Sequence, residues 1–338
     1  MEGKAGDRIL LAHGGGGILM RELISKIVGR LGGQQPGSLQ DSALVTLESS
    51  RIAFTTDSFV VSPLFFPGGD IGHLAVFGTV NDLAVSGATP HCISLSMIIE
   101  EGLELERFER IVESVAEAAR EAGVTVITGD TKVVEHGKAD GIFITTTGIG
   151  LVPNGVDLAS SNARPTDKVL VNGSIGEHGL AILSRREGID FGSTLQSDTA
   201  PLSKLTVPLL ERVRGVRAMR DATRGGLAAV LNEIALDSGV CIRIREEAIP
   251  VSEAVRKGCE LMGYDPLHIA NEGKLVAVVS DEEAAAALEL MQGHPLGREA
   301  TIIGEIAQAP AGHVILETPL GGERVVDIPY GDLLPRIC

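Results

Sequence analysis

The chain has 338 residues, 44% of them hydrophobic and 22% charged, so it is long enough for two folded domains and is not disordered. Its formal net charge of −16 disfavours nucleic acids and anionic membrane surfaces as partners. No apolar run reaches the ~18 residues that a membrane helix needs, and the N-terminus has no signal-peptide pattern. We therefore expect a cytoplasmic protein.

A glycine-rich run precedes the first predicted helix. His13 is followed by Gly14, Gly15 and Gly16, and a helical pattern covers residues 18–31. Backbone N–H groups in such a run can cradle a phosphate, and a flexible linker is the alternative interpretation. The Gly-Lys-Ser/Thr ending of a Walker A loop does not follow.

Carboxylates accompany the next elements. Asp41 ends a polar stretch, strand-like runs cover 43–47 and 51–56, and Asp57 closes the second run, where a turn or cap residue is the alternative. Asp82 lies in a predicted helix over 72–86 among apolar neighbours, where an unpaired polar group would be costly to bury. We therefore predict that this helix presents Asn81 and Asp82 to a cleft, with Asp82 as a candidate Mg²⁺ ligand.

The rest of the first half has a strand–helix–strand pattern and forms an α+β domain that ends near residue 153. Asp130, Thr131 and Lys132 are expected just beyond a strand end. The predicted strands cover 90–99, 124–128 and 142–150, and an amphipathic helix covers 104–122.

The second half repeats this make-up without a sequence repeat. Asp221 precedes Arg224, Gly225 and Gly226 at the start of a predicted helix, a place that favours a phosphate or a metal coupled to one. The predicted strands cover 168–173, 241–245, 275–280, 300–307, 314–317 and 324–327, and the predicted helices cover 176–186, 205–213, 227–238, 251–262 and 283–291.

The chain ends on a cysteine. Cys92, Cys241 and Cys259 lie in apolar segments and are expected to be buried thiols, whereas Cys338 is expected to pack against nothing. Pro335 favours an extended end, which is either a frayed terminus or an arm that carries a group for the rest of the protein to modify.

Five aspartates at strand ends and helix starts would repel one another in one cleft unless cations held them, which favours Mg²⁺ with ATP. Turn and capping aspartates are the alternative. The five are Asp41, Asp57, Asp82, Asp130 and Asp221.

Several stretches closely resemble the HypE hydrogenase-maturation proteins of the PurM-like (AIR synthetase-like) superfamily, and the resemblance covers residues 9 to 338. The terminal Pro-Arg-Ile-Cys singles out HypE, and Ala222 stands where that family pattern has Pro. The stretches are 13–16, 55–59, 78–84, 129–134, 221–227, 271–274 and 335–338.

The resemblance implies a PurM-like α+β fold with two domains and an extended C-terminal tail. It divides the chain into an N-terminal segment (1–40), an ATP-binding, dimerising domain (41–153), a second domain (154–312) and the tail (313–338). ATP would lie between the domains, with contributions across a homodimer.

The implied activity is dehydration of an S-carboxamide on Cys338 to an S-cyanide with ATP, for the iron of [NiFe]-hydrogenase. HypF would supply the carbamoyl group, and a HypC–HypD scaffold would accept the cyanide. Glu272 is our candidate general base, with a structural acceptor role as the alternative, and Lys132 would neutralise phosphate charge.

The other implied site residues fall into two sets. The metal ligands would be Asp41, Asp57, Asp82 and Asp221. The nucleotide-binding residues would be His13, Gly14, Gly15, Gly16, Thr79, Asn81, Asp130, Thr131, Arg224, Gly225 and Gly226. A selenophosphate or aminoimidazole ribonucleotide synthetase, or a scaffold that binds ATP without catalysis, remains the alternative function.

Overall fold

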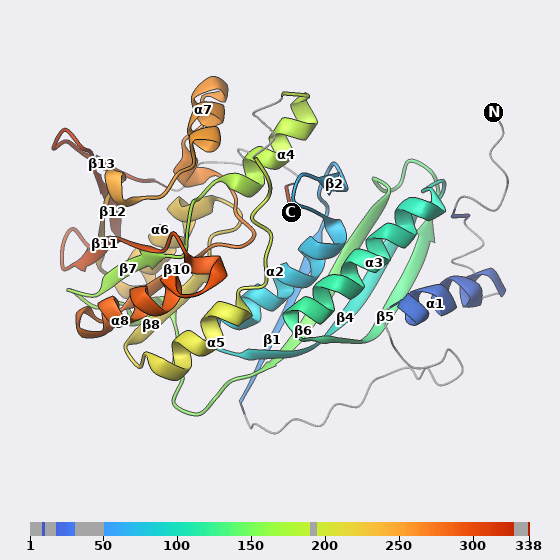
Figure 1. Cartoon of the computed structure of the whole chain (residues 1–338), viewed down its shortest axis with the longest axis horizontal. Coiled ribbons are helices and arrows are strands. Elements are labelled where there is room, and N and C mark those ends of the chain that lie inside the picture. Colours follow the sequence, from blue (N-terminus) through green and yellow to red (C-terminus); the bar gives the residue numbers. More distant parts are fainter. Residues whose placement is uncertain (1–8, 11–17, 31–50, 190–194, 328–336) are drawn as a thin grey trace.

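The computed structural model describes residues 9–10, 18–30, 51–189, 195–327 and 337–338. The chain forms two α+β halves, each built on one larger sheet (Figure 1). The predicted strand over 43–47 lies outside the described residues.

The first half is a four-stranded sheet with helices on one face. Its elements are α1 (Ile18–Arg30), β1 (Ile52–Phe59), β2 (Phe65–Phe66), β3 (Gly69–Asp70), α2 (Ile71–Val85), β4 (Thr89–Glu100), α3 (Leu105–Ala122), β5 (Thr125–Val134) and β6 (Ile142–Leu151). The strand order is β1-β6-β4-β5, and only β4 and β5 run parallel. The short β2 and β3 form a separate hairpin before α2.

Helices α2 and α3 cover one face of this sheet (Figure 1), and among the described residues no helix packs on the other face, which we call the open face. α2 is buried nearly all round, whereas α3 buries the stripe that includes Phe108, Ile111 and Val115, as its pattern predicts. Residues alternate along β6 between buried and half-buried, because successive side chains point to opposite faces. On the open face Phe54 is 69% exposed and Ile52 is 49% exposed.

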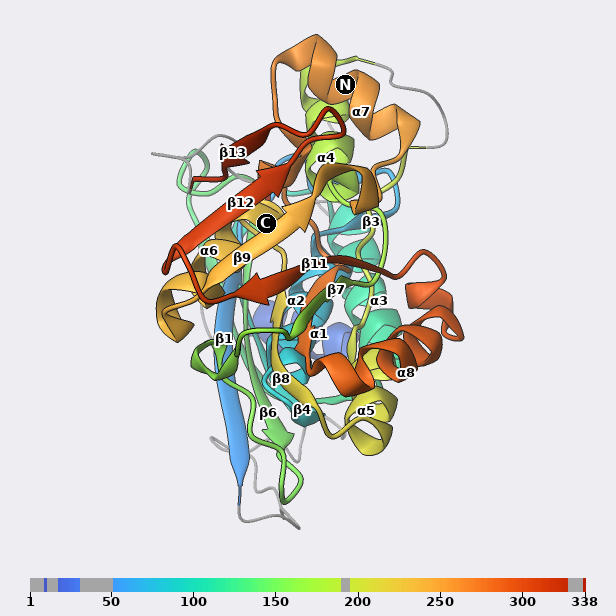
Figure 2. The same cartoon turned by 90° about the vertical axis from the view of Figure 1, so that its left-hand side faces the viewer.

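The second half is a seven-stranded sheet. Its elements are β7 (Lys168–Val171), α4 (Glu177–Glu187), α5 (Ser203–Arg212), β8 (Val216–Asp221), α6 (Gly226–Ser238), β9 (Cys241–Arg245), α7 (Glu253–Met262), β10 (Leu275–Val279), α8 (Asp281–Gln292), β11 (Thr301–Ala307), β12 (His313–Glu317) and β13 (Glu323–Val325). The order is β13-β12-β9-β11-β7-β10-β8, and several of these strands lie side by side in Figure 2.

The inner strands of this sheet are covered on both faces. Along β10, Val276 and Val278 belong to the core that α6 completes, whereas Leu275 and Ala277 belong to the core beneath α5 and α8. All five residues of β10 are buried, which explains its unbroken apolar sequence.

The predicted positions of three aspartates relative to strands and helices differ from the structure. β8 was not predicted, and Asp221 is its last residue rather than the start of a helix. Asp57 and Asp130 lie within strands, not beyond their ends, because the pairing continues past them: Asp57 pairs with Thr146 and Asp130 with Ser96. The predicted burial of Cys92, Cys241 and Cys259 is confirmed.

One apolar core crosses from the first half to the second. It joins residues beneath α2 and α3 to Leu180 on α4, Val255 on α7 and Ile337 near the C-terminus. The two halves therefore pack as one body around the end of the chain. Among the described helices, none has the length and apolar character that a membrane span requires.

Candidate active site

Asp57 and Asp82 meet where β1 passes beneath α2. Thr55 Oγ1 donates a hydrogen bond of 2.8 Å to Asp82 Oδ2. Gly78 allows the close approach, because a Cβ there would lie 2.8 Å from the Phe59 ring and 3.7 Å from Asp57 Oδ2. α2 therefore presents Asp82 beside Asp57, which agrees with the prediction for Asp82.

Asp221 reaches the same place from the second half. A cleft of about 420 Å³ is lined by Thr55, Asp82, Arg220 and Asp221, among others. Burial, and then the charge of Asp82, raises the pKa of Asp221 to about 7. Burial also raises the pKa values of Asp57 and Asp82, and Asp82 adds to the shift of Asp57.

These raised pKa values mean that the three carboxylates lack enough positive charge around them. Carboxylate oxygens are the ligands that Mg²⁺ prefers, so the donor set fits this ion together with a phosphate. Among the described residues, however, no three acidic, His or Cys side chains are arranged so that they alone would hold one ion. His13, Gly14, Gly15, Gly16 and Asp41 lie outside the described residues.

Asp130 and Lys132 lie elsewhere. Lys132 Nζ is 2.7 Å from both carboxylate oxygens of Asp130, and their side chains are 56% and 62% exposed for Asp130 and Lys132, respectively. Asp57 and Gly129 are three strands apart through Thr146 and Leu95, a separation of roughly 14 Å at ~4.8 Å per strand.

The Asp130 side chain also lies on the opposite face of the sheet from the aspartate cluster. It follows Gly129 by one residue and so faces the open side of the sheet, opposite to Asp57. Within one chain the structure therefore does not bring Asp130 or Lys132 to the aspartate cluster. Thr131 is buried on the helix side of the same strand.

Thr79 and Asn81 are buried on α2, and both use their side chains inside the protein, so the prediction that the helix presents Asn81 to a cleft is wrong. The Thr79 hydroxyl is hydrogen-bonded to the hydroxyl of Thr146 on β6, so it fixes α2 to the sheet. Asn81 Nδ2 donates to the carbonyl oxygens of Ala200 and Glu272, each at 3.1 Å, and Asn81 Oδ1 accepts from the Leu202 N–H at 2.7 Å.

Two glycines with positive φ lie at the start of α6, and the second lies close to the backbone of residues 267–269. Gly225 and Gly226 have φ of +80° and +63°. A Cβ on Gly226 would lie 2.6 Å from the carbonyl oxygens of Leu267 and Ile269, so only glycine fits. The preceding Arg224 donates from Nη2 to Cys338 Sγ at 3.3 Å.

The end of the chain is inserted between the halves. Ile337 is 4% exposed, and Cys338 packs against the same core. The prediction that Cys338 packs against nothing is therefore wrong, because Ile337 anchors it. Burial, and then the nearby charge of Glu272, raises the pKa of the Cys338 thiol to about 11.

Glu272 is buried beside this thiol. Its Oε1 has no hydrogen-bond partner among the described residues. Burial and then the charge of Asp198, followed by the aspartates of the cleft, raise the pKa of Glu272 well above its usual value. A buried carboxyl group that has an unpartnered oxygen and interacts electrostatically with the thiol is suited to proton transfer at the group which that thiol carries.

Three residues of this region were missed in the sequence. Asp198 accepts hydrogen bonds from the N–H groups of Glu272 and Gly273 and lies 3.2 Å from Lys274 Nζ. His178 contacts the chain end through the Ile337 carbonyl. Lys274 belongs to a motif that resembles HypE, but Asp198 and His178 carried no local signal.

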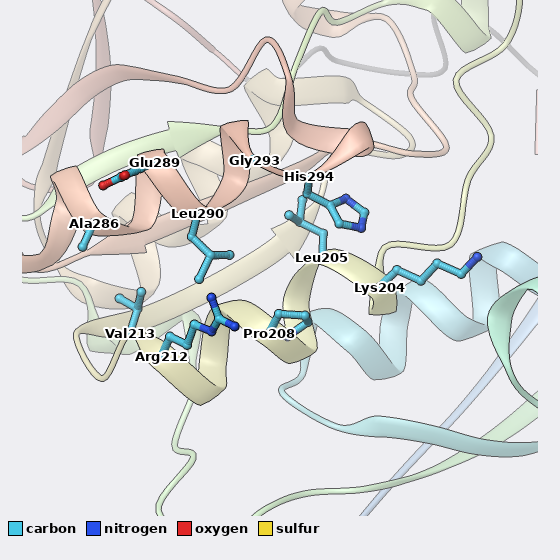
Figure 3. Close-up of a pocket in the computed structure, with 10 residues that line it drawn as sticks. All are labelled: Lys204, Leu205, Pro208, Arg212, Val213, Ala286, Glu289, Leu290, Gly293 and His294. Carbon is cyan, nitrogen blue, oxygen red and sulfur yellow. The ribbon is translucent and has the colours of Figure 1, made fainter.

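A second cavity, of about 530 Å³, lies between α5 and α8 (Figure 3). Arg212 from α5 and Leu290 from α8 face each other across it, with His294 near its other end. None of the residues discussed above lines it, so we place the candidate site at the aspartate cleft and the chain end.

Comparison with known proteins agrees with this fold. Residues 39–152 match the family model for the N-terminal domain of AIR synthase related proteins, and residues 164–317 match the model for the C-terminal domain. The PurM-like α+β fold is thereby confirmed.

Similar proteins share nearly the whole chain. Carbamoyl dehydratase HypE of Azotobacter vinelandii is 52% identical over 97% of this chain and 96% of its own length. A crystal structure of hydrogenase maturation protein HypE in complex with ATP has 45% identity and a TM-score of 0.94, and the match covers 97% of this chain and 99% of that one.

A crystal structure of a HypE–HypF complex matches as well. It has 47% identity and a TM-score of 0.81, and the match covers 93% of this chain and 100% of that one. The A. vinelandii relative and a relative from Cupriavidus necator both carry the name of an enzyme, carbamoyl dehydratase, and they match 97% and 98% of the chain. The chain belongs to the HypE family of AIR synthase related proteins.

Proposed function

We propose that the chain is a carbamoyl dehydratase that uses ATP to convert an S-carboxamide on Cys338 into an S-cyanide. The observation that carries the proposal is the setting of the Cys338 thiol, which accepts a hydrogen bond from Arg224 and is close enough to Glu272, whose Oε1 has no partner among the described residues, for the charge of Glu272 to raise its pKa. The name of the A. vinelandii relative and the ATP complex of a HypE relative support it.

The reaction divides into two steps. The amide oxygen of the S-carboxamide attacks the γ-phosphorus of ATP, ADP leaves, and an imidate phosphate forms as one N–H proton is released. Loss of phosphate with removal of the remaining N–H proton then gives the S-cyanide. Together the steps remove one water from the carboxamide and hydrolyse one ATP to ADP and phosphate.

Glu272 is the proposed base for the nitrogen proton. Its raised pKa gives its ionised form a high affinity for a proton. Ionisation becomes easier when positive charge enters the cleft, since nearby carboxylates contribute to that shift. Arg224 donates to the sulfur and would hold the reacting group beside Glu272.

Nucleotide phosphates would meet Arg224 and the backbone of Gly225 and Gly226 at the start of α6, where the Gly226 N–H already donates to the Thr223 carbonyl. Asp57, Asp82 and Asp221, with Asp41, would hold Mg²⁺, which would supply charge to stabilise the transferred phosphoryl group. His13, Gly14, Gly15, Gly16 and Thr131 remain proposed nucleotide contacts. We assign Thr79 and Asn81 a supporting role, because their side chains are already bonded within the protein.

Lys132 and Asp130 fit the reaction only if a second copy contributes them. We propose a homodimer through the open face of the first sheet, where Phe54 and Ile52 are exposed. In that arrangement each site would receive Lys132 from the other copy, and the residue would offset phosphate charge. The domain division at residue 153 is part of the same proposal.

The proposed partners follow from the reaction. A carbamoyl group must be delivered to Cys338, and a HypE relative forms a complex with HypF. We propose HypF as the donor and a HypC–HypD scaffold as the acceptor of the cyanide, in the cytoplasm.

The test is the intact mass of the C-terminal peptide. The protein is incubated with carbamoyl donor and carbamoyltransferase, and then with ATP. We expect an adduct on Cys338 that loses one water only after ATP is added. ATP binding without loss of water would instead identify a scaffold, and ATP turnover independent of the adduct would indicate another synthetase of this fold.

A further inference from the structure

The last peptide group of the chain is held by a buried histidine. His178 Nε2 lies 2.8 Å from the carbonyl oxygen of Ile337. Because a carbonyl oxygen only accepts, Nε2 must carry the proton and donate. His178 is on α4, which is 159 residues away from Ile337 in the sequence.

A hydrogen bond at the other ring nitrogen, Nδ1, fixes this tautomer of His178. His178 Nδ1 is 2.8 Å from Ser197 Oγ, which in turn is 2.6 Å from Thr199 Oγ1 and accepts from the Thr199 N–H at 3.2 Å. Ser197 therefore donates to Nδ1 and accepts from Thr199. Burial lowers the pKa of His178, so the ring is neutral near pH 7 with its proton on Nε2.

The segment Ser197–Thr199 is itself fixed by both halves. The Ser197 N–H donates to the Pro67 carbonyl at 2.8 Å. A Cβ on Gly68 would lie 2.7 Å from Ser197 N, and a Cβ on Gly273 would lie 1.9 Å from Asp198 O. Close backbone contact on both sides leaves this segment little freedom.

The same segment positions Glu272. Asp198 accepts from the N–H groups of Glu272 and Gly273 at 3.1 and 3.0 Å. Ser197 therefore sets the ring that holds Ile337, while its neighbour Asp198 sets the backbone that carries the proposed base.

Side chains complete a socket for the chain end. Ile337 is 4% exposed within the apolar core, and the Phe66 ring meets the His178 ring edge-on with centroids 5.4 Å apart. The Val60 N–H donates to the Cys338 oxygen at 3.3 Å. The last two residues are thus held by one apolar side chain and by two backbone oxygens.

We propose that His178 is a positioning residue that docks the chain end, with Ser197 fixing its tautomer, so that the group on Cys338 is presented to Glu272. The consequence for catalysis rests on the proposed function, but the docking itself does not. Docking by backbone contacts leaves the sulfur free to carry different groups, since neither His178 nor Val60 contacts Sγ.

The docking test measures how fast iodoacetamide alkylates Cys338 in the full-length protein. The thiolate is the reactive form, and in the socket the thiol is part-buried with a pKa of about 11, so alkylation reports the undocked fraction. Loss of one hydrogen bond to a backbone oxygen should raise the rate about three- to tenfold in His178→Leu. His178→Gln keeps a donor near the Nε2 position and should return most of the protection.

Controls separate docking from loosened folding. Cys92, Cys241 and Cys259 are buried in the same protein, so their alkylation should not change. His313→Leu changes an exposed histidine on β12 and should behave as wild type. Equal rates at Cys338 in wild type and His178→Leu would overturn the proposal, as would parallel labelling of the buried cysteines or failure of His178→Gln to protect.

A second measurement connects docking to the reaction. Carbamoylation of Cys338 should be unchanged in His178→Leu, whereas ATP-dependent loss of water from the adduct should slow, because the carboxamide is held less firmly in line with the phosphate and Glu272. Slowing of both steps alike would overturn the positioning role. If wild type loses no water, the proposed function fails, and the alkylation rates still decide the docking.

Discussion

The side-chain amide of Asn81 lies 3.1 Å from the backbone oxygen of Glu272, so the helix that carries Asp82 is tied to the segment that carries Glu272. The same side chain also accepts from the Leu202 N–H. Asn81 and Asp82 are consecutive on α2, so one helical turn sets the distance between the aspartate cleft and the proposed base.

We expect Asn81→Leu to lower both stability and turnover. The change removes the acceptor of the buried Leu202 N–H and the Asn81 donor to the Ala200 carbonyl, whereas the Glu272 carbonyl keeps the Ala200 N–H; one unsatisfied buried group costs ~1–3 kcal/mol. Urea unfolding should show a loss of at least about 2 kcal/mol. Asn232→Leu is the matched control, because Asn232 is a buried asparagine bonded only within the second half: its loss should affect stability without affecting turnover.

Asp82→Asn should abolish ATP hydrolysis and leave the fold intact. The amide is the same size and can still accept from Thr55, but one charge is lost where we propose Mg²⁺ and phosphate to bind. ATPase rates and circular dichroism measure the two effects. Asp237→Asn removes a charge from the exposed side of α6 and should leave both unchanged. Wild-type hydrolysis by the Asp82 variant would remove this residue from the site.

Much of the fold follows from the sequence because its helices carry periodic patterns. The helix predicted over 104–122 is found as α3, Leu105–Ala122. β8 was not predicted, because Val216–Asp221 is short and contains two arginines that interrupt its apolar pattern. Long helices with a periodic pattern were therefore predictable from the sequence. Short strands whose conformation depends on tertiary pairing were not predicted.

The site was predictable only in part. Asp57, Asp82 and Asp221 converge in the structure. Their convergence could be predicted because each of them lies in a motif that resembles HypE. Lys132 lies on the opposite face of the sheet from these aspartates. Its placement depends on strand order and register, which the residues next to it in the sequence do not specify. The contact of His178 with Ile337 joins residues 159 apart, with no local pattern at either end.

Glu272→Gln should bind ATP nearly as wild type and dehydrate the carboxamide more slowly. A general base typically contributes ~10²–10⁴-fold, and glutamine cannot take the proton. The Asp198 and Asn81 bonds use the Glu272 backbone, so the substitution leaves them in place. Single-turnover mass spectrometry measures the rate, and nucleotide titration measures binding. Loss of nucleotide binding would assign Glu272 to a structural role.

Stability of the ligand-free protein should fall as pH rises from about 4 to about 7, above which the contribution of Asp221 levels off. Asp221 has a pKa of about 7 when folded, against 3.8 as the ordinary value, so in this window the folded chain holds a proton that the unfolded chain has lost. The contribution of Asp221 to stability therefore decreases with pH between 3.8 and about 7 and becomes flat once Asp221 is ionised in both states. Urea unfolding of Asp221→Asn should show a shallower slope, and an unchanged slope would contradict the shift.

Cys338→Ala should eliminate cyanide formation and preserve the nucleotide site. The carbon that becomes cyanide must be bonded to this sulfur, and Cys92, Cys241 and Cys259 are buried. Because Ile337 supplies the anchor, removal of the thiol should lower stability by only about 1 kcal/mol or less. Inserting two glycines between Ile337 and Cys338 keeps the thiol but displaces it from Arg224 and Glu272, so it should permit carbamoylation and prevent dehydration. Mass spectrometry of the C-terminal peptide distinguishes these outcomes, and ATP-dependent loss of water from an adduct on any other cysteine would exclude the chain end from the reaction.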